Sequence, residues 1–225
     1  LPSTKGESDR NDIMIVAAKK EVINDYIDML RELKLTTVLV DVDGFALENI
    51  WETTSEMVEN VALVDIGASK MNINIISEGV SVLARDIVVG SEQLTDQISN
   101  TLDIDYAHAE RIKLGLDPFE EDKGTVEKIF NQTCTQWVLE IKKALDLYSA
   151  NNPNSPLKSL ILSGGGSKVN GLIDYIEQET GLKVIAFNPF EKMICDEKIF
   201  DPHYLRSIAP EMAIATGLAI RKSAF

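Results

Sequence analysis

The sequence predicts an α/β protein. Short, wholly apolar runs alternate with longer segments whose apolar residues recur at helical spacing. Two of these runs, at 61–64 and 160–162, lead into turns of glycine and small residues. With 225 residues, of which 44% are hydrophobic and 26% charged, the chain is long enough to bury a substantial core.

The first part of the chain shows a strand–helix–strand–helix order. Residues 1–12 are polar and are expected to be a disordered lead-in. The apolar run at 13–18 predicts a buried strand, and 19–33 carries one apolar helical face. A second strand is predicted at 36–42 and a short helix at 46–52. This order favours parallel strands.

A second unit begins at Val61. We expect a hairpin of strands 61–65 and 71–76, and a third strand at 80–89. The pattern then becomes helical, with helices near 91, at 106–113 and at 125–148. The remaining elements are a strand at 157–162, a helix at 169–179, a strand at 183–186 and a helix at 207–221.

Charge and cysteine content exclude several classes of function. The net charge is −14 without a strong Lys/Arg cluster, which argues against nucleic acid or anionic lipid as the main partner. No apolar stretch has the length of a membrane span. Cys134 and Cys195 are expected to be free thiols, and with His108 and His203 they lack the short spacings of a zinc site.

The turn after the strand at 61–66 is a candidate phosphate site. Asp65 ends the apolar run and can hold Mg²⁺ directly or through water. The N–H groups of Gly67, Ala68 and Ser69 can meet phosphate oxygens. The alternative is an ordinary hairpin turn, which Gly and Asp also favour.

A second glycine turn and a charged helix complete a candidate nucleotide cleft. Gly164, Gly165 and Gly166 precede a helix and can let a nucleoside approach bare backbone, although a strand-to-helix turn is the alternative. Glu110 and Lys113 share one helix face and can line a nucleoside pocket, although such a pair is often a solvated ion pair.

Asp43 is a candidate catalytic carboxylate. It follows the strand predicted at 36–42 and could orient a water for attack on a terminal phosphate. The alternative is a helix N-cap or a turn residue.

Taken in order, the motifs resemble those of the actin-like ATPases, and most closely those of the PilM family of type IV pilus assembly proteins. The resemblance covers roughly residues 13–222 and rests on segments 17–20, 40–47, 64–68, 109–113, 162–166, 171–172, 188–190, 209–210 and 217–221. It implies an actin-like (ribonuclease H-like) two-lobed fold with ATP and Mg²⁺ in the cleft. The positions that match the second phosphate loop, the nucleoside helix and the adenosine loop are Asp65 to Ala68, Glu110 with Lys113, and Gly164 to Gly166.

This chain also departs from the pattern of the related proteins. Related proteins carry a Glu-Pro pair where this chain has Asp43-Gly44, so we expect a weak ATPase at most. No first phosphate loop precedes Ile13, and the chain begins with Leu1, so we expect an inactive fragment that binds ATP weakly. The expected domains are the lead-in 1–12, a first-lobe remnant 13–60, a second-lobe core of 61–90 and 157–225, and a helical subdomain 91–156.

The function implied is a cytoplasmic scaffold at the inner face of the inner membrane. It would bind ATP and dock the short cytoplasmic peptide of a PilN-like inner-membrane protein. Other pilus assembly proteins and self-association are further expected contacts, whereas nucleic acid and direct membrane insertion are not expected. A sugar-kinase-like phosphotransferase and an FtsA-like division protein of the same fold are the alternatives.

Overall fold

The computed structural model describes residues 15–55, 59–117 and 122–221. The chain divides into two compact units. Residues 1–41 together with 222–225 form one, and Val42–Arg221 form the other. The finer division into four domains stays a prediction.

The described part of the smaller unit contains one helix, α1 (Lys20–Glu32), which confirms the helix expected at 19–33. The strands expected at 13–18 and 36–42 are wrong wherever those residues are described; residues 13 and 14 lie outside the described ranges. A strand persists only beside another strand that completes its hydrogen bonds, and no ladder forms here. Val38 and Val40 are accordingly 73% and 57% exposed.

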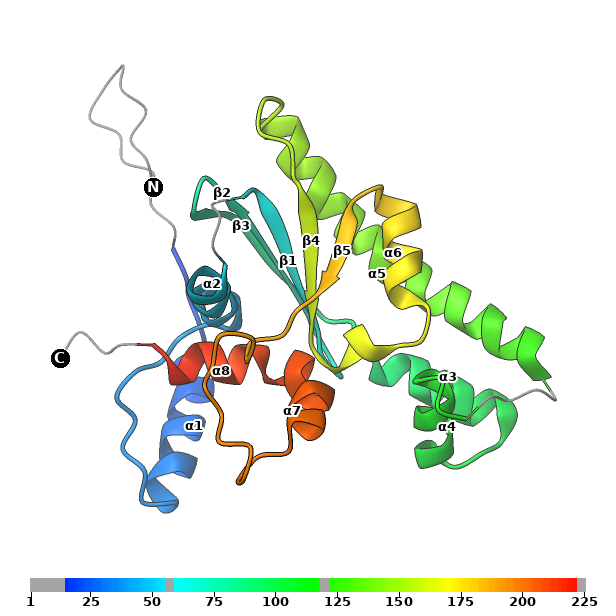
Figure 1. Ribbon diagram of the computed structural model, residues 1–225, viewed down its shortest axis with the longest axis horizontal. Helices are drawn as coiled ribbons and strands as arrows, with labels where there is room; N and C mark the ends of the chain where they lie inside the picture. Colours follow the sequence, from blue (N-terminus) through cyan, green and yellow to red (C-terminus); the bar gives the residue numbers. More distant parts are fainter. Residues whose placement is uncertain (1–14, 56–58, 118–121, 222–225) are drawn as a thin grey trace. The chain divides into compact units, whose positions relative to one another are not determined.

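The larger unit is built on a five-stranded sheet in the order β3-β2-β1-β4-β5 (Figure 1). The hairpin of β1 (Val61–Ile66) and β2 (Met71–Ser77) is antiparallel and continues into β3 (Val80–Ile87), as expected. On the other side, β4 (Ser159–Ser163) runs parallel to β1, and β5 (Lys183–Ala186) parallel to β4. The sheet is therefore mixed, with β1 at its centre.

The helices of the larger unit largely follow the sequence pattern. Their bounds are Asp43–Thr54 for α2, Glu92–Leu102 for α3, Tyr106–Lys113 for α4, Lys123–Asn151 for α5 and Leu172–Thr180 for α6. The single helix expected at 207–221 is wrong. The chain forms α7 (Pro202–Ile208), a 3-10 turn (Ala209–Met212) and α8 (Ala213–Ala219), because Pro210 has no N–H with which to continue a helix.

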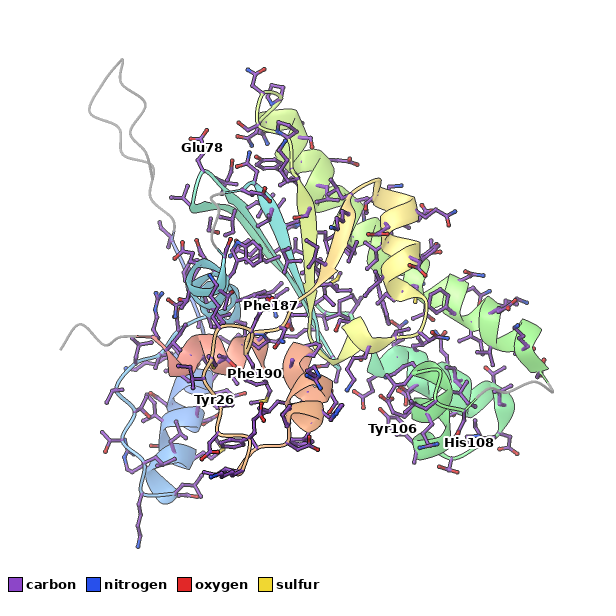
Figure 2. The ribbon with its side chains drawn as sticks, viewed as in Figure 1. Tyr26, Glu78, Tyr106, His108, Phe187 and Phe190 are labelled. Carbon is purple, nitrogen blue, oxygen red and sulfur yellow. The ribbon has the colours of Figure 1, made fainter. Side chains whose placement is uncertain are left out.

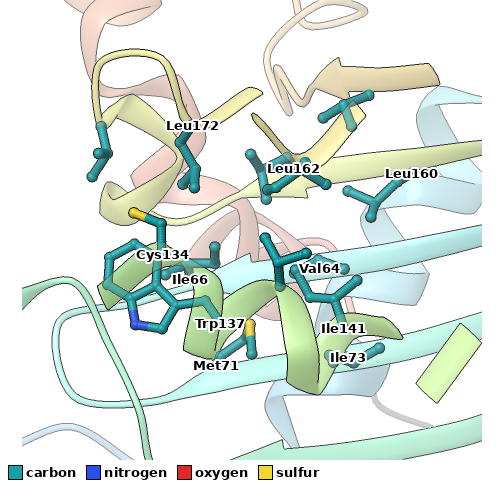
Figure 3. Close-up of a cluster of buried hydrophobic side chains, with 14 of the residues drawn as sticks. Val64, Ile66, Met71, Ile73, Cys134, Trp137, Ile141, Leu160, Leu162 and Leu172 are labelled. Atoms are coloured by element: carbon teal, nitrogen blue, oxygen red, sulfur yellow. The ribbon is translucent and has the colours of Figure 1, made fainter. Parts of the chain in front are cut away.

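The three central strands, β1, β2 and β4, are buried on both faces, which explains the continuous apolar runs of β1 and β4. One face packs against α5 and α6 in the larger hydrophobic cluster (Figures 1 and 3). Trp137 of α5 is fully buried at this contact, beside Cys134. The strand residues that share this face are Ala62, Val64, Ile66, Met71, Ile73, Ile75, Leu160 and Leu162.

The opposite face packs against α2 and α8 in a smaller cluster that includes Leu47, Ile50, Leu63 and Ile161. The two helices approach very closely, since a Cβ on Gly217 would lie 1.9 Å from the Ala46 carbonyl oxygen. Asn49 Nδ2 also donates to the Gly217 carbonyl at 2.9 Å. These contacts fix α2 on the face of the sheet that carries Asp65.

Candidate functional site

The parallel strands β1 and β4 bring the two glycine turns to the same edge of the sheet. Asp65 on β1 is the cross-strand neighbour of Ser163 on β4. Ser163 Oγ donates to Asp65 Oδ2 at 2.7 Å. Burial raises the pKa of the Asp65 carboxyl, and the Ser163 hydrogen bond only partly opposes that effect. Asp65 is thus a buried carboxyl group that accepts one hydrogen bond from a side chain in the ranges that the structure describes.

The turn after β1 is tied to the start of α3. Ser91 N–H donates to the Gly67 carbonyl at 2.9 Å, and Glu92 N–H donates to the Ala68 carbonyl at 3.0 Å. The Gly67 N–H is itself used, because it donates to the Lys70 carbonyl at 2.9 Å. In the described part of the chain, the N–H groups of Ala68 and Ser69 have no acceptor. Of the expected phosphate donors, these two are available.

The second glycine turn packs directly on β1. Gly164 has φ +82°, and a Cβ there would lie 2.3 Å from the Ile66 carbonyl oxygen. A Cβ on Gly166 would lie 2.4 Å from Ile66 Cγ2. On Gly165 it would meet nothing closer than Glu211 Cγ at 3.7 Å. Packing therefore requires glycine at 164 and 166, and Gly165 is the position whose open side can receive a ligand.

Glu110 and Lys113 form a buried network rather than a solvated ion pair. The Lys113 side chain is 4% exposed, and its ammonium lies 2.7 Å from Glu110 Oε2. It also donates to Thr95 Oγ1 at 2.8 Å and to the Ser91 carbonyl at 3.4 Å. The three N–H groups of Lys113 thus have internal acceptors. Glu110, 36% exposed, is the member of the pair that faces solvent.

The helix that carries Glu110 adjoins the second glycine turn. Asn170 N–H, just after that turn, donates to the Lys113 carbonyl at 3.1 Å. Tyr106 lies one turn before Glu110 on α4 and is 47% exposed (Figure 2). Its position on the same helix face adds an aromatic ring that the sequence interpretation missed. The sequence does contain a signal for this ring, because Tyr106 precedes Glu110 by four residues, the spacing of one helical turn.

Asp43 is the first residue of α2 and does not cap the helix with its side chain. Its carboxylate forms an ion pair with Lys70, the residue after the first glycine turn. The bond to Asp43 is the main cause that raises the pKa of Lys70, and Asp86 and Asp65 add to it. Asp43 therefore faces the same edge of the sheet as Asp65, and Lys70 joins the candidate site.

Asn72 is a second residue that the sequence interpretation missed. It is the antiparallel partner of Asp65 and is 2% exposed. Neither its Nδ2 nor its Oδ1 has a hydrogen-bond partner within the described ranges. Buried amides are almost always hydrogen-bonded, so an unsatisfied one beside Asp65 indicates a position that a ligand or its water can complete.

These residues fit a nucleotide with a hydrated magnesium ion. Free N–H groups at Ala68 and Ser69 suit phosphate oxygens, and Asp65 suits a water of the ion's shell. Among the residues that the structure describes, no group of three or more His, Cys, Asp or Glu could hold a metal directly. A nearby hollow of 450 Å³ borders both Ala68 and Ser69; the rest of its lining comes from α3, Gln136 and residues 88–90, and does not include Asp65.

Several solved structures share this architecture. A chain of the PilM-PilN type IV pilus biogenesis complex matches with TM-score 0.77 and 25% identity, over 91% of this chain and 58% of that one. EutJ, an ethanolamine utilization protein from Carboxydothermus hydrogenoformans, gives 0.60 and 17%, over 85% and 57%. MreB5 of Spiroplasma citri bound to ADP gives 0.61 and 14%, over 90% and 65%. The fold is therefore actin-like, as expected.

The family follows from the sequence match. Residues 1–223 match the family described as type IV pilus assembly protein PilM, and the chain belongs to that family. It spans less than two thirds of the length of each solved chain named above. No helix in the described ranges is long and apolar enough to cross a bilayer.

Proposed function

We propose that this chain carries the second-lobe half of an ATP site and works as a cytoplasmic scaffold in type IV pilus assembly. ATP would lie over the edge of the sheet where β1 and β4 end. Asp65 would hold a water of the Mg²⁺ shell, and Ala68 and Ser69 would bind phosphate oxygens. The nucleoside would lie between Gly165 and the solvent-facing carboxylate of Glu110. Magnesium would supply charge neutralisation at the phosphates.

The observation that carries this proposal is the contact between the two glycine turns. Ser163 at the end of β4 bonds Asp65 at the end of β1, at 2.7 Å. In parallel α/β sheets, ligands bind beyond the carboxyl ends of adjacent strands, because loop N–H groups and helix starts gather there. Burial also raises the pKa of the Asp65 carboxyl group, and carboxyl groups with a shifted pKa are common at functional sites.

Isothermal titration calorimetry with Mg·ATP tests the nucleotide site. We expect weak but saturable binding, which Gly165→Val abolishes by blocking approach to the backbone. Asp146→Ala, on the exposed side of α5 near the opposite end of the sheet, is the control and should bind like the unaltered chain. Equal binding by the Gly165 variant would mean that the nucleoside lies elsewhere.

The proposed partner site lies in the smaller unit. Residues 35–40, with Ile27 and Arg31 of α1, line a hollow of 360 Å³. Val38 and Val40 in its wall are largely exposed, and their backbone belongs to no helix or strand ladder in the described part of the chain. An extended apolar peptide can add to such a segment through main-chain hydrogen bonds. We assign this surface to the cytoplasmic peptide of a PilN-like protein.

Fluorescence anisotropy with a labelled PilN N-terminal peptide from the same genome tests the partner site. Val38→Asp should lower the affinity about tenfold or more, since a buried apolar contact would become an unpaired charge. Leu147→Asp, on the 49% exposed Leu147 of α5, is the control and should leave affinity unchanged. Equal loss in both variants, or none in either, would exclude docking on this segment.

A further inference from the structure

A row of polar side chains crosses the sheet on the face that α2 covers. Asp86 on β3 is the cross-strand neighbour of Asn72 on β2, Asn72 that of Asp65 on β1, and Asp65 that of Ser163 on β4. Cross-strand neighbours point to the same side of a sheet. The row therefore places two carboxylates, one amide and one hydroxyl side by side at the edge where the glycine turns meet.

The first turn of α2 is anchored above this row at two points. Lys70, before β2 begins, pairs with Asp43. Asn74, four residues later, donates from Nδ2 to the Gly44 carbonyl at 3.1 Å and accepts from Ser81 Oγ at 2.5 Å. Asn72 lies between these anchors on the same strand face, and among the described residues its amide has no partner. We call the Asn72 amide and the Lys70–Asp43 pair beside it the polar niche.

Lys70 supplies the positive charge at this niche. Its ammonium is attracted by Asp43, Asp65 and Asp86, which come from α2, β1 and β3. Its backbone is held in the turn, because the Lys70 carbonyl accepts the Gly67 N–H. Its side chain is nevertheless 50% exposed, so the ammonium can leave Asp43 without disturbing the fold.

We propose that Lys70 is a phosphate-binding residue that exchanges its bond to Asp43 for the terminal phosphates of the nucleotide, with Asn72 completing the niche behind it. This inference rests on the proposed ATP site and extends it. An arriving polyphosphate meets three carboxylates, so a resident ammonium offsets the repulsion and forms a charge-assisted hydrogen bond. The exchange also frees the Asp43 carboxylate. Binding then depends less on Mg²⁺ than it would in a site without this lysine.

Titration of the chain with ATP, once with Mg²⁺ and once with EDTA, tests the role of Lys70. Lys70→Met should weaken ATP binding by roughly tenfold to a hundredfold in EDTA, the loss expected for one charge-assisted bond. Magnesium should restore part of that loss. Lys70→Arg should keep most of the affinity, and Lys128→Met on the exposed side of α5 should change nothing. Circular dichroism checks that each variant is folded.

The outcomes separate the two proposals. If the unaltered chain binds no ATP in either condition, the proposed ATP site is wrong and this inference fails with it. If the unaltered chain binds ATP and Lys70→Met binds equally well in both conditions, the ATP site stands and the role of Lys70 is refuted.

A second pair of variants tests Asn72. Asn72→Leu removes a buried amide that has no partner among the described residues, so thermal stability should rise while ATP affinity falls. Asn74→Leu is the matched control, and it should lower stability because it breaks the bonds to Gly44 and Ser81. A fall in stability in both variants with unchanged ATP affinity would make Asn72 a structural residue and overturn its assignment to the niche.

Discussion

At the second glycine turn, the same substitution should change the free energy of unfolding in opposite directions at two adjacent positions, Gly164 and Gly165. Gly164→Ala places a Cβ 2.3 Å from the Ile66 carbonyl oxygen and in a backbone conformation, φ +82°, that side chains rarely adopt. The backbone strain costs about 1–3 kcal/mol, and forcing the loop away from β1 costs about 1–3 kcal/mol more. Gly165→Ala meets no atom within 3.4 Å, since its nearest neighbour lies at 3.7 Å.

The free energies of unfolding expected for the two alanine variants differ by several kcal/mol. Gly164→Ala should destabilise the fold by roughly 2–6 kcal/mol. Gly165→Ala should stabilise it by about 0.4–1 kcal/mol, because alanine restricts the unfolded chain. Urea unfolding followed by circular dichroism at pH 7 measures both free energies. Similar stabilities for the two variants would refute the packing of this turn on Ile66.

Three further predictions follow from burial and packing. Because burial raises the pKa of Asp65, the stability that its protonated form contributes is present at low pH and is lost as pH rises. Asp65→Asn should therefore raise the free energy of unfolding at pH 7 by about 1 kcal/mol, and the gain should shrink towards pH 4; a loss at pH 7 would contradict this. Burial raises the pKa of the Cys134 thiol to about 12. Maleimide should therefore label the half-buried Cys195 in the native protein and modify Cys134 only after unfolding. Fast labelling of both cysteines in the native protein would disprove the packing of α5. Gly217→Ala should lower the melting temperature by several degrees, since its Cβ would overlap the Ala46 carbonyl; an unchanged melting temperature would exclude the close contact of α2 and α8.

The sequence predicted β1 and β4, at the centre of the sheet, well, because both strands are buried on both faces and carry continuous apolar runs. The helix at 106–113 has the same bounds in the structure. The expected strands at 13–18 and 36–42 failed for a related reason. Apolar, extended sequence specifies a strand only where a neighbouring strand is present, and the sequence pattern alone does not reveal that neighbour.

The sequence predicted the loops of the candidate site but not the side-chain contacts around them. The glycine turns at 67–69 and 164–166 are visible because they interrupt apolar strands. The pair Asp43–Lys70 joins residues 27 positions apart, and no local pattern indicates it. Asn72 appears in the sequence only as a polar residue alternating with apolar ones in β2, which is the ordinary pattern of a strand with a polar face. Its unsatisfied amide is a property of the folded chain.

The arrangement also changes how the glycines are understood. Sequence reasoning assigned all three of Gly164, Gly165 and Gly166 to the nucleoside. The outer two are required by contact with Ile66, which leaves Gly165 as the ligand-facing position. Likewise Lys113 holds α3 and α4 together through Thr95, and Glu110 is the partner that faces solvent.

Two-dimensional ¹H–¹⁵N NMR of the labelled chain during titration with Mg·ATP tests the central claim most directly, because it detects weak binding and locates it. We predict that the amides of Ala68, Ser69 and Gly165 shift along one saturation curve, together with residues around Glu110. Shifts confined to other surfaces, such as the hollow that Asn131, Gln132 and Thr135 of α5 help to line, or no shifts at millimolar ATP, would contradict a nucleotide site between the two glycine turns.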